Sequence, residues 1–171
     1  MEVMSIKLPD CFKRITYRQA IVKYGTDRPD LRNPLELIEI KNLVEKSSFK
    51  VFSIPAGQPG GRVAAMRIPG GGALSRKQID EYTQLVTSHG AKGLAYIKVQ
   101  DVNSGEEGLQ SPIIKFLEKE VLSQILNKTS ASNGDLLFFG AGSAHIVNNS
   151  MAALRDVVAK DLNLIKKDWF P

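Results

Sequence analysis

The segment 24–32, YGTDRPDLR, combines two carboxylates with two guanidinium groups in a short polar stretch. A guanidinium can bind a phosphate through two parallel hydrogen bonds, so Arg28 and Arg32 could position an anionic ligand. The alternative is a loop capped by Asp27 and Asp30, whose ion pairs hold only the loop's own shape. The residues alone favour this structural interpretation.

A second candidate for phosphate chemistry is the run of three glycines that follows Pro69. Glycine-rich loops that open a helix can cradle phosphates with their backbone N–H groups. The spacing here fits neither G-x-x-x-x-G-K-S/T nor G-x-G-x-x-G. Residues 70–72 are therefore expected to form a sharp turn with a positive φ angle.

No pattern predicts a catalytic residue or a metal site. The sequence has no Ser-His-Asp set, no HExxH and no zinc-ligand spacing. Glu106 and Glu107 are adjacent and would point in different directions, which does not suit a paired acid and base. His89 is expected to cap a helix, and His145 to be solvated or locally bonded. Cys11 is the only cysteine, so no internal disulfide is predicted and it is taken as a bystander.

The composition indicates one globular domain with a basic surface. Hydrophobic residues make up 43% of the 171 residues and charged residues 24%, while the net charge is +5 and the pI about 9.3. A basic balance is compatible with a polyanionic partner such as RNA, although many domains are mildly basic for other reasons. No apolar run is long enough for a membrane span and no signal peptide opens the chain, so we expect a cytoplasmic protein with no membrane partner.

The spacing of apolar residues predicts a mixture of helices and strands. Thr16 and Gln19 form a capping box for a helix that ends near Tyr24, with Gly25 as its stop, and Ser75 and Gln78 open a second capped helix that ends near Gly90. Strands are predicted at 35–40, 49–54, 62–68, 94–99 and 136–139, and loops at 55–61 and 101–108. Helical stretches are predicted at 42–46, after Pro112, again around 121–126, and after Ser143, and residues 140–142 are expected to end the last strand. These elements give an α+β class.

Several stretches resemble the insertion (GAD) domain of bacterial-type aspartyl-tRNA synthetases. They are RVAAMRIPGGGALSRKQIDEYTQLV with GAKGLAYIKV, then GLQSPIIKFL, and then DLLFFGAG with a following ALR helix. The segment 24–32 resembles that family's YGxDKPDxR motif, which joins the catalytic core to the insertion. Because the motifs occur in the same order along nearly the whole chain, the resemblance is specific. Arg28 stands where lysine is common, and Gly142 where aspartate is common.

The resemblance implies an antiparallel β-sheet flanked by helices, with a catalytic-core flank at 1–33, the insertion at 34–165 and a return toward the core at 166–171. It also implies a longer parent enzyme that uses ATP and Mg²⁺ to attach aspartate to tRNA and that forms a homodimer. The parent's ATP-contacting and active-site motifs have no counterpart in this sequence. The chain is therefore expected to be an inactive piece with no cofactor of its own.

The expected role is an accessory contact with tRNA or with the parent catalytic domain. The candidate phosphate contacts are Arg28, Arg32, Lys77, Lys92 and Lys98, and the residues assigned to the core junction are Tyr24, Gly25, Asp27, Pro29 and Asp30. Each cation could equally be a solvated surface charge. The alternatives are a spacer that docks on the catalytic core without RNA, and a related domain of a tRNA-dependent amidotransferase subunit, which the segment 24–32 disfavours.

Overall fold

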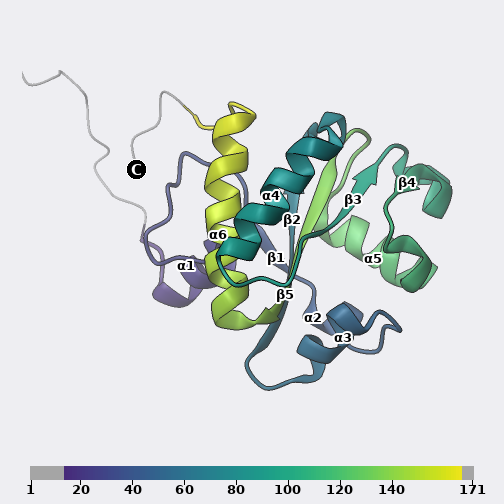
Figure 1. Cartoon of the computed structure of the whole chain (residues 1–171), viewed down its shortest axis with the longest axis horizontal. Helices are drawn as coiled ribbons and strands as arrows, with labels where there is room; N and C mark the ends of the chain where they lie inside the picture. Colours follow the sequence, from purple (N-terminus) through teal and green to yellow (C-terminus); the bar gives the residue numbers. More distant parts are fainter. Residues whose placement is uncertain (1–13, 167–171) are drawn as a thin grey trace, which may run out of the picture.

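Five antiparallel strands form one sheet between two layers of helices (Figure 1). The computed structural model describes residues 14–166, so Cys11 and the outer parts of both expected flanks lie outside the described residues. The strand order is β1-β2-β5-β3-β4, with β1 at Leu37–Glu39, β2 at Gly61–Ile68, β3 at Ala95–Val99, β4 at Leu109–Gln110 and β5 at Leu136–Ser143. The predicted α+β class with an antiparallel sheet is confirmed.

The helices divide between the two faces of the sheet. Helices α4 (Arg76–Ser88) and α6 (Ala144–Asp161) cover one face, and α2 (Lys41–Val44), α3 (Lys50–Gly57) and α5 (Lys119–Thr129) cover the other. Helix α1 (Tyr17–Tyr24) packs beside β1 and α6 (Figure 1). Short 3-10 turns occupy Gly71–Ala73, Val102–Gly108 and Ile114–Phe116. Each face of the sheet therefore has its own hydrophobic core.

The central pair of strands, β2 and β5, contributes to both cores. Successive side chains of a strand point to opposite faces, so Met66 packs under α4 and α6 while Val63 and Ala65 pack under α3 and α5. Gly140 of β5 lets α6 approach closely, since a Cβ there would lie 2.7 Å from Cγ of Met151. A larger residue at this position would push α6 away from the sheet.

Both predicted capping boxes are present. The Thr16 hydroxyl accepts a hydrogen bond from the Gln19 N–H at the start of α1, and the Ser75 hydroxyl does the same for Gln78 at the start of α4. Gly25 ends α1 with a φ of 74°, as expected of a helix stop. The predicted glycine turn is also confirmed, with a φ of 69° at Gly70.

The strand predicted at 49–54 is wrong, and so is part of the loop predicted at 55–61. Residues Lys50–Gly57 form helix α3, in which Phe52 and Ala56 are both buried. Their spacing of four residues is the helical repeat, but the local alternation of apolar and polar residues in FKVFSI imitates a strand. The rings of Phe49 and Phe52 contact each other, with centroids 4.8 Å apart, and the Phe52 ring also lies 5.5 Å from that of Phe139 on β5, so this turn packs on the sheet.

Three boundaries also differ from the sequence prediction. Strand β5 continues to Ser143, because residues 140–142 pair with β2 along its whole length, whereas the strand was expected to end there. The expected loop at 101–108 contains the 3-10 turns of Val102–Gly108. The first helical stretch predicted after Pro112 is only one 3-10 turn, while the second is confirmed as α5, which begins at Lys119. Ser143 precedes α6 as expected, but its side chain makes no capping hydrogen bond.

A buried arginine on α6 holds the segment 24–32 in place. The Arg155 side chain is almost fully buried and donates hydrogen bonds to three main-chain carbonyls, those of Leu35 at 2.6 Å, Asn33 at 2.7 Å and Asp30 at 2.9 Å. The guanidinium carbon also lies 4.8 Å from the centroid of the Tyr24 ring. Burial lowers the pKa of Arg155, but an arginine remains charged at neutral pH. Arg155 thus satisfies carbonyls that have no partner in a strand or helix.

A second buried arginine, on β2, holds the C-terminal end of α1. Arg62 donates hydrogen bonds to the last-turn carbonyls of Ile21 and Val22, to the side chain of Asn148 on α6, and to a carboxylate oxygen of Glu39 at 3.1 Å. A positive charge at the C-terminal end of a helix is favourable because the free carbonyls carry a partial negative charge. Helix α1, the sheet and α6 therefore form one packed unit.

We expect Arg155→Met to lower the free energy of unfolding by about 3–5 kcal/mol, because it leaves the carbonyls of Asn33 and Leu35 without a donor and removes one of the two donors to the Asp30 carbonyl. Arg155→Lys should recover only part of this loss, since one ammonium cannot donate in all three directions. Urea denaturation followed by circular dichroism measures both effects, with Arg76→Met on the exposed surface of α4 as the control. A loss below about 1 kcal/mol for Arg155→Met would contradict the anchoring role.

Candidate functional site

The segment 24–32 lies against α6 and presents its buried and exposed residues on different sides. Tyr24 and Gly25 are buried, Pro29 and Asp30 are half-buried, and Asp27 is exposed. A Cβ on Gly25 would come within 2.5 Å of the Asn148 carbonyl oxygen, so glycine is required there both for its φ angle and for this close approach. Of the residues assigned to the core junction, Tyr24 and Gly25 therefore pack inward, while Asp27 remains at the surface.

Two carboxylates bind the ends of this segment. The Tyr24 hydroxyl donates to the Glu36 carboxylate at 3.3 Å, and burial, followed by the charge of Glu36, raises the pKa of Tyr24. Asp30 accepts hydrogen bonds from Nε of Arg32 at 3.0 Å and from Nη2 at 2.8 Å, and the Arg32 guanidinium lowers the pKa of Asp30. The ion pair within the loop that the structural interpretation predicted is therefore present between these two residues.

The five candidate phosphate contacts fall in three places rather than in one patch. Arg28 and Arg32 lie in the segment 24–32, and Lys77 and Lys98 lie near the start of α4, where Nζ of Lys98 donates to the Leu74 carbonyl at 2.6 Å. Lys92 lies beyond the other end of α4, in the connection to β3. Two of these cations face carboxylates, Arg32 facing Asp30 and Lys77 facing Glu81 at 3.9 Å.

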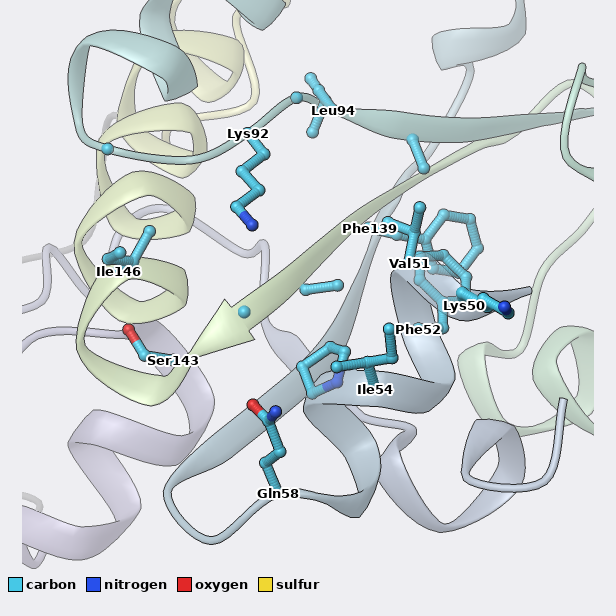
Figure 2. Close-up of a pocket in the computed structure, with 16 residues that line it drawn as sticks. Lys50, Val51, Phe52, Ile54, Gln58, Lys92, Leu94, Phe139, Ser143 and Ile146 are labelled. Atoms are coloured by element: carbon cyan, nitrogen blue, oxygen red, sulfur yellow. The ribbon is translucent and has the colours of Figure 1, made fainter. Parts of the chain in front are cut away.

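A groove of about 680 Å³ opens between α3, the connection from α4 to β3, and the end of β5 (Figure 2). Val51, Ile54 and Pro55 form its wall on α3, while Lys92 and Leu94 form the opposite side. Figure 2 shows the Lys92 side chain reaching into the space between these elements. Its lining is mainly apolar, with a positive charge within reach.

The groove and the two buried arginines were not found by reasoning from the sequence. Once residues 49–54 are predicted as a strand, Val51 and Ile54 are assigned to a sheet rather than to the wall of a groove. Arg155 lies in the ALR motif, so the resemblance drew attention to this arginine but did not indicate that it is buried or that it binds main-chain carbonyls. Arg62 could not be recognised, because nothing in the sequence distinguishes an arginine buried in a strand from one on its surface.

Neither a membrane span nor a metal cluster is found in the described residues. Within residues 14–166, no helix has the length and hydropathy needed to cross a bilayer. The same residues contain no group of three or more His, Cys, Asp or Glu side chains arranged to hold a metal ion.

The Asp30–Arg32 pair predicts a pH-dependent stability. We expect Asp30→Asn to lower the free energy of unfolding at pH 7 by about 0.5–1 kcal/mol, the usual range for a partly exposed ion pair. Because the folded-state pKa of Asp30 lies below its ordinary value of 3.8, its stabilisation is present above that value and is lost as the pH falls through the folded-state pKa. Wild-type and variant proteins should therefore converge in acid.

Thermal or urea unfolding measured between pH 7 and pH 3 checks this expectation. Asp27→Asn removes an exposed carboxylate from the same segment and serves as the matched control. An Asp30→Asn effect of the same size at both ends of the pH range would show that the ion pair is not its cause.

Sequence comparison finds relatives that match this chain over nearly its full length. It is 53% identical over 168 residues to the aspartate–tRNA(Asp/Asn) ligase of Legionella pneumophila strain Corby, and 52% identical to the proteins of the same name in strains Paris and Philadelphia 1. Each alignment covers 98% of this chain and 28% of the relative. The chain thus spans little more than a quarter of the length of these curated relatives.

A family model also matches the core of the chain. The model is that of the GAD domain, and the match runs over residues 52–151, from α3 through the sheet to the middle of α6. The matched residues include both central strands and the groove lining except Lys50 and Val51. Because this match covers more than half of the sequence, and because the expected motifs occur in their expected order, the chain belongs to the GAD domain family.

Proposed function

We propose that this chain is the insertion domain of an aspartate–tRNA ligase and that it makes an accessory, non-catalytic contact with tRNA. The observation that carries the proposal is the 53% identity over 98% of the chain to a ligase of that name. Aspartate activation with ATP and Mg²⁺ is assigned to the rest of the parent, a homodimer in the cytoplasm. In this proposal residues 34–165 are the insertion, and residues 1–33 and 166–171 lead from and to the catalytic domain.

Charge supports the contact with RNA. The net charge of +5 favours a polyanion, and Arg28 and Lys92 are exposed cations for which no ion pair is found within residues 14–166. Lys77 is 87% exposed and its carboxylate neighbour is 3.9 Å away, which leaves it free to exchange partners. Arg32 and Lys98 are the weaker candidates, because each already makes a hydrogen bond shorter than 3 Å.

The packing supports a module that moves as one body with the segment 24–32. Arg155 and Arg62 tie this segment and α1 to α6 and the sheet through main-chain carbonyls. A chain that leaves the catalytic domain through this segment would then fix the orientation of the insertion. Such a fixed orientation is useful for a surface that must meet a large, rigid nucleic acid.

One observation favours the second candidate, a spacer that docks on the catalytic domain without RNA. Tyr17 is 72% exposed and Val22 is 40% exposed, so α1 presents apolar surface outward at the end of the module assigned to the core junction. Apolar side chains of this size are typical of a protein contact. The third candidate, an amidotransferase subunit, is disfavoured by the names of the relatives and by the segment 24–32.

We expect the 171-residue protein to bind an RNA hairpin that reproduces the acceptor stem of an aspartate-accepting tRNA, with an affinity that falls as salt rises. The slope of log K against log salt should be about −0.9 for each phosphate neutralised. Lys77→Glu should make this slope less steep by about 0.9, the contribution of one phosphate. Fluorescence anisotropy across salt concentrations measures the slope. Lys128→Glu on α5, at the opposite face of the sheet, is the matched control.

An absence of binding at low salt, or binding without a salt slope, would rule out the contact with tRNA and leave the spacer as the better account. Equal losses for Lys77→Glu and Lys128→Glu would show that only the net charge matters.

We also expect the chain alone to show no aspartate-dependent exchange between ATP and pyrophosphate. The resemblance assigns both the ATP-contacting arginine and the active-site histidine pair to parts of the parent outside this sequence. Exchange of labelled pyrophosphate into ATP measures this step, with the full-length parent as the positive control. Exchange that co-purifies with the 171-residue protein would overturn the non-catalytic assignment.

A further inference from the structure

The end of β5 has a free edge that faces the groove. Strand β3 begins at Ala95, which pairs with Phe139, so residues 140–143 of β5 have β2 on one side and, among the described residues, no strand on the other. The 92–94 connection departs from β5 at this point, and no hydrogen bond joins it to β5 within residues 14–166. This part of β5 is therefore a short edge within an otherwise central strand.

The main-chain polar groups of Ala141 point toward that free edge. In an antiparallel pair, opposite residues alternate between those that hydrogen bond to each other and those that do not. The Ala144 N–H donates to the Gly60 carbonyl, and the Val63 carbonyl accepts from Ile40 of the other neighbouring segment. By this alternation Val63 and its partner Ala141 do not bond to each other, so the N–H and C=O of Ala141 face the groove.

The wall opposite this edge is apolar and exposed. Val51 is 57% exposed and Ile54 is 53% exposed, and both lie on α3 at the groove (Figure 2). The two aromatic residues of the lining, Phe52 and Phe139, are at most 1% exposed, so they offer no face on which a base could stack. Aliphatic walls without an accessible ring suit a peptide better than a nucleotide.

The charged residues of the lining are both positive. Lys50 and Lys92 line the groove, and no aspartate or glutamate of the described part of the chain does. The groove is therefore complementary to an acidic ligand.

We propose that this groove binds an extended peptide of a partner protein, in which acidic and aliphatic residues alternate, as an added strand beside residues 140–143 of β5. The peptide continues the line of β3, and its main chain pairs with the N–H and C=O of Ala141. Alternate side chains then reach opposite faces of the sheet, so the aliphatic ones meet Val51 and Ile54 while the acidic ones are available to Lys92. Apart from Lys92, which is also a candidate phosphate contact, the residues of this interaction differ from those proposed to contact tRNA.

The test uses the ¹⁵N-labelled 171-residue protein and an acetylated, amidated hexapeptide of alternating aspartate and valine. Titration followed by NMR should shift the amide signals of Ala141 and Ala95, with a Kd of about 1 mM or tighter. The Ala141 amide should also exchange more slowly with solvent in the complex. The same peptide with N-methylated valines, which lack the N–H donor, should not bind.

Two groove variants and one matched control test the lining. Val51→Glu and Lys92→Glu should each weaken binding about 5-fold or more, because each places a carboxylate against the acidic peptide. Lys46→Glu makes the same charge change at an exposed residue outside the groove and should leave the Kd within about 2-fold. Val51 is not a candidate phosphate contact, so Val51→Glu should leave the titration with the acceptor-stem hairpin unchanged.

Several results would overturn the proposal. They are unshifted Ala141 signals at saturating peptide, equal binding of a lysine–valine hexapeptide, or equal binding of the N-methylated peptide. Shifts of the groove signals with a single-stranded RNA hexamer but not with the peptide would assign the groove to nucleic acid instead. Concentration-dependent shifts of the same signals without any ligand would assign it to a second copy of the chain. The loss of acceptor-stem binding would contradict the proposed function without affecting this one.

Discussion

The pairing of β2 with β5 is the interaction on which the rest of the structure depends. Eight residues of each strand lie in register, from Gly61 opposite Ser143 to Ile68 opposite Leu136. These strands supply side chains to both cores, and every large helix packs on one of the two faces. Gly140 keeps α6 close to this pair, while Arg62 extends from β2 to the end of α1. The groove also follows from this pairing, because β5 is as long as β2 but longer than β3.

The two kinds of arginine in this protein have opposite physical roles. Arg155 and Arg62 lose their contact with water and gain several carbonyl and carboxylate acceptors, so their charge serves the fold. Arg28 stays exposed, where its charge remains available to another molecule. The net charge calculated from the composition counts buried and exposed arginines equally. The charge that is available to a polyanion is therefore smaller than the total number of basic residues implies, and its distribution matters more than its sum.

Local signals predicted much of the fold. The capping boxes at Thr16 and Ser75 and the glycine at position 25 depend on hydrogen bonds and backbone angles within a few residues, so the sequence determines them directly. Helix α3 and the last residues of β5 depend on distant partners. Phe52 is buried because β2 and β5 lie beneath it, and residues 140–143 are a strand because β2 extends that far. The groove joins these two places, which explains why motif reasoning did not reveal it.

The contacts of Arg155 also have a consequence for the order of folding during synthesis. Its carbonyl partners lie 120–125 residues earlier in the chain. At ribosomal rates of about 5–20 residues per second, the segment 24–32 leaves the ribosome roughly 6–25 s before Arg155 can reach it. During that interval the contacts with Arg155 cannot form, whereas Arg62 follows its two carbonyl partners on α1 by only 40 and 41 residues. The first-made part of this module is therefore fixed last, when its final long helix arrives.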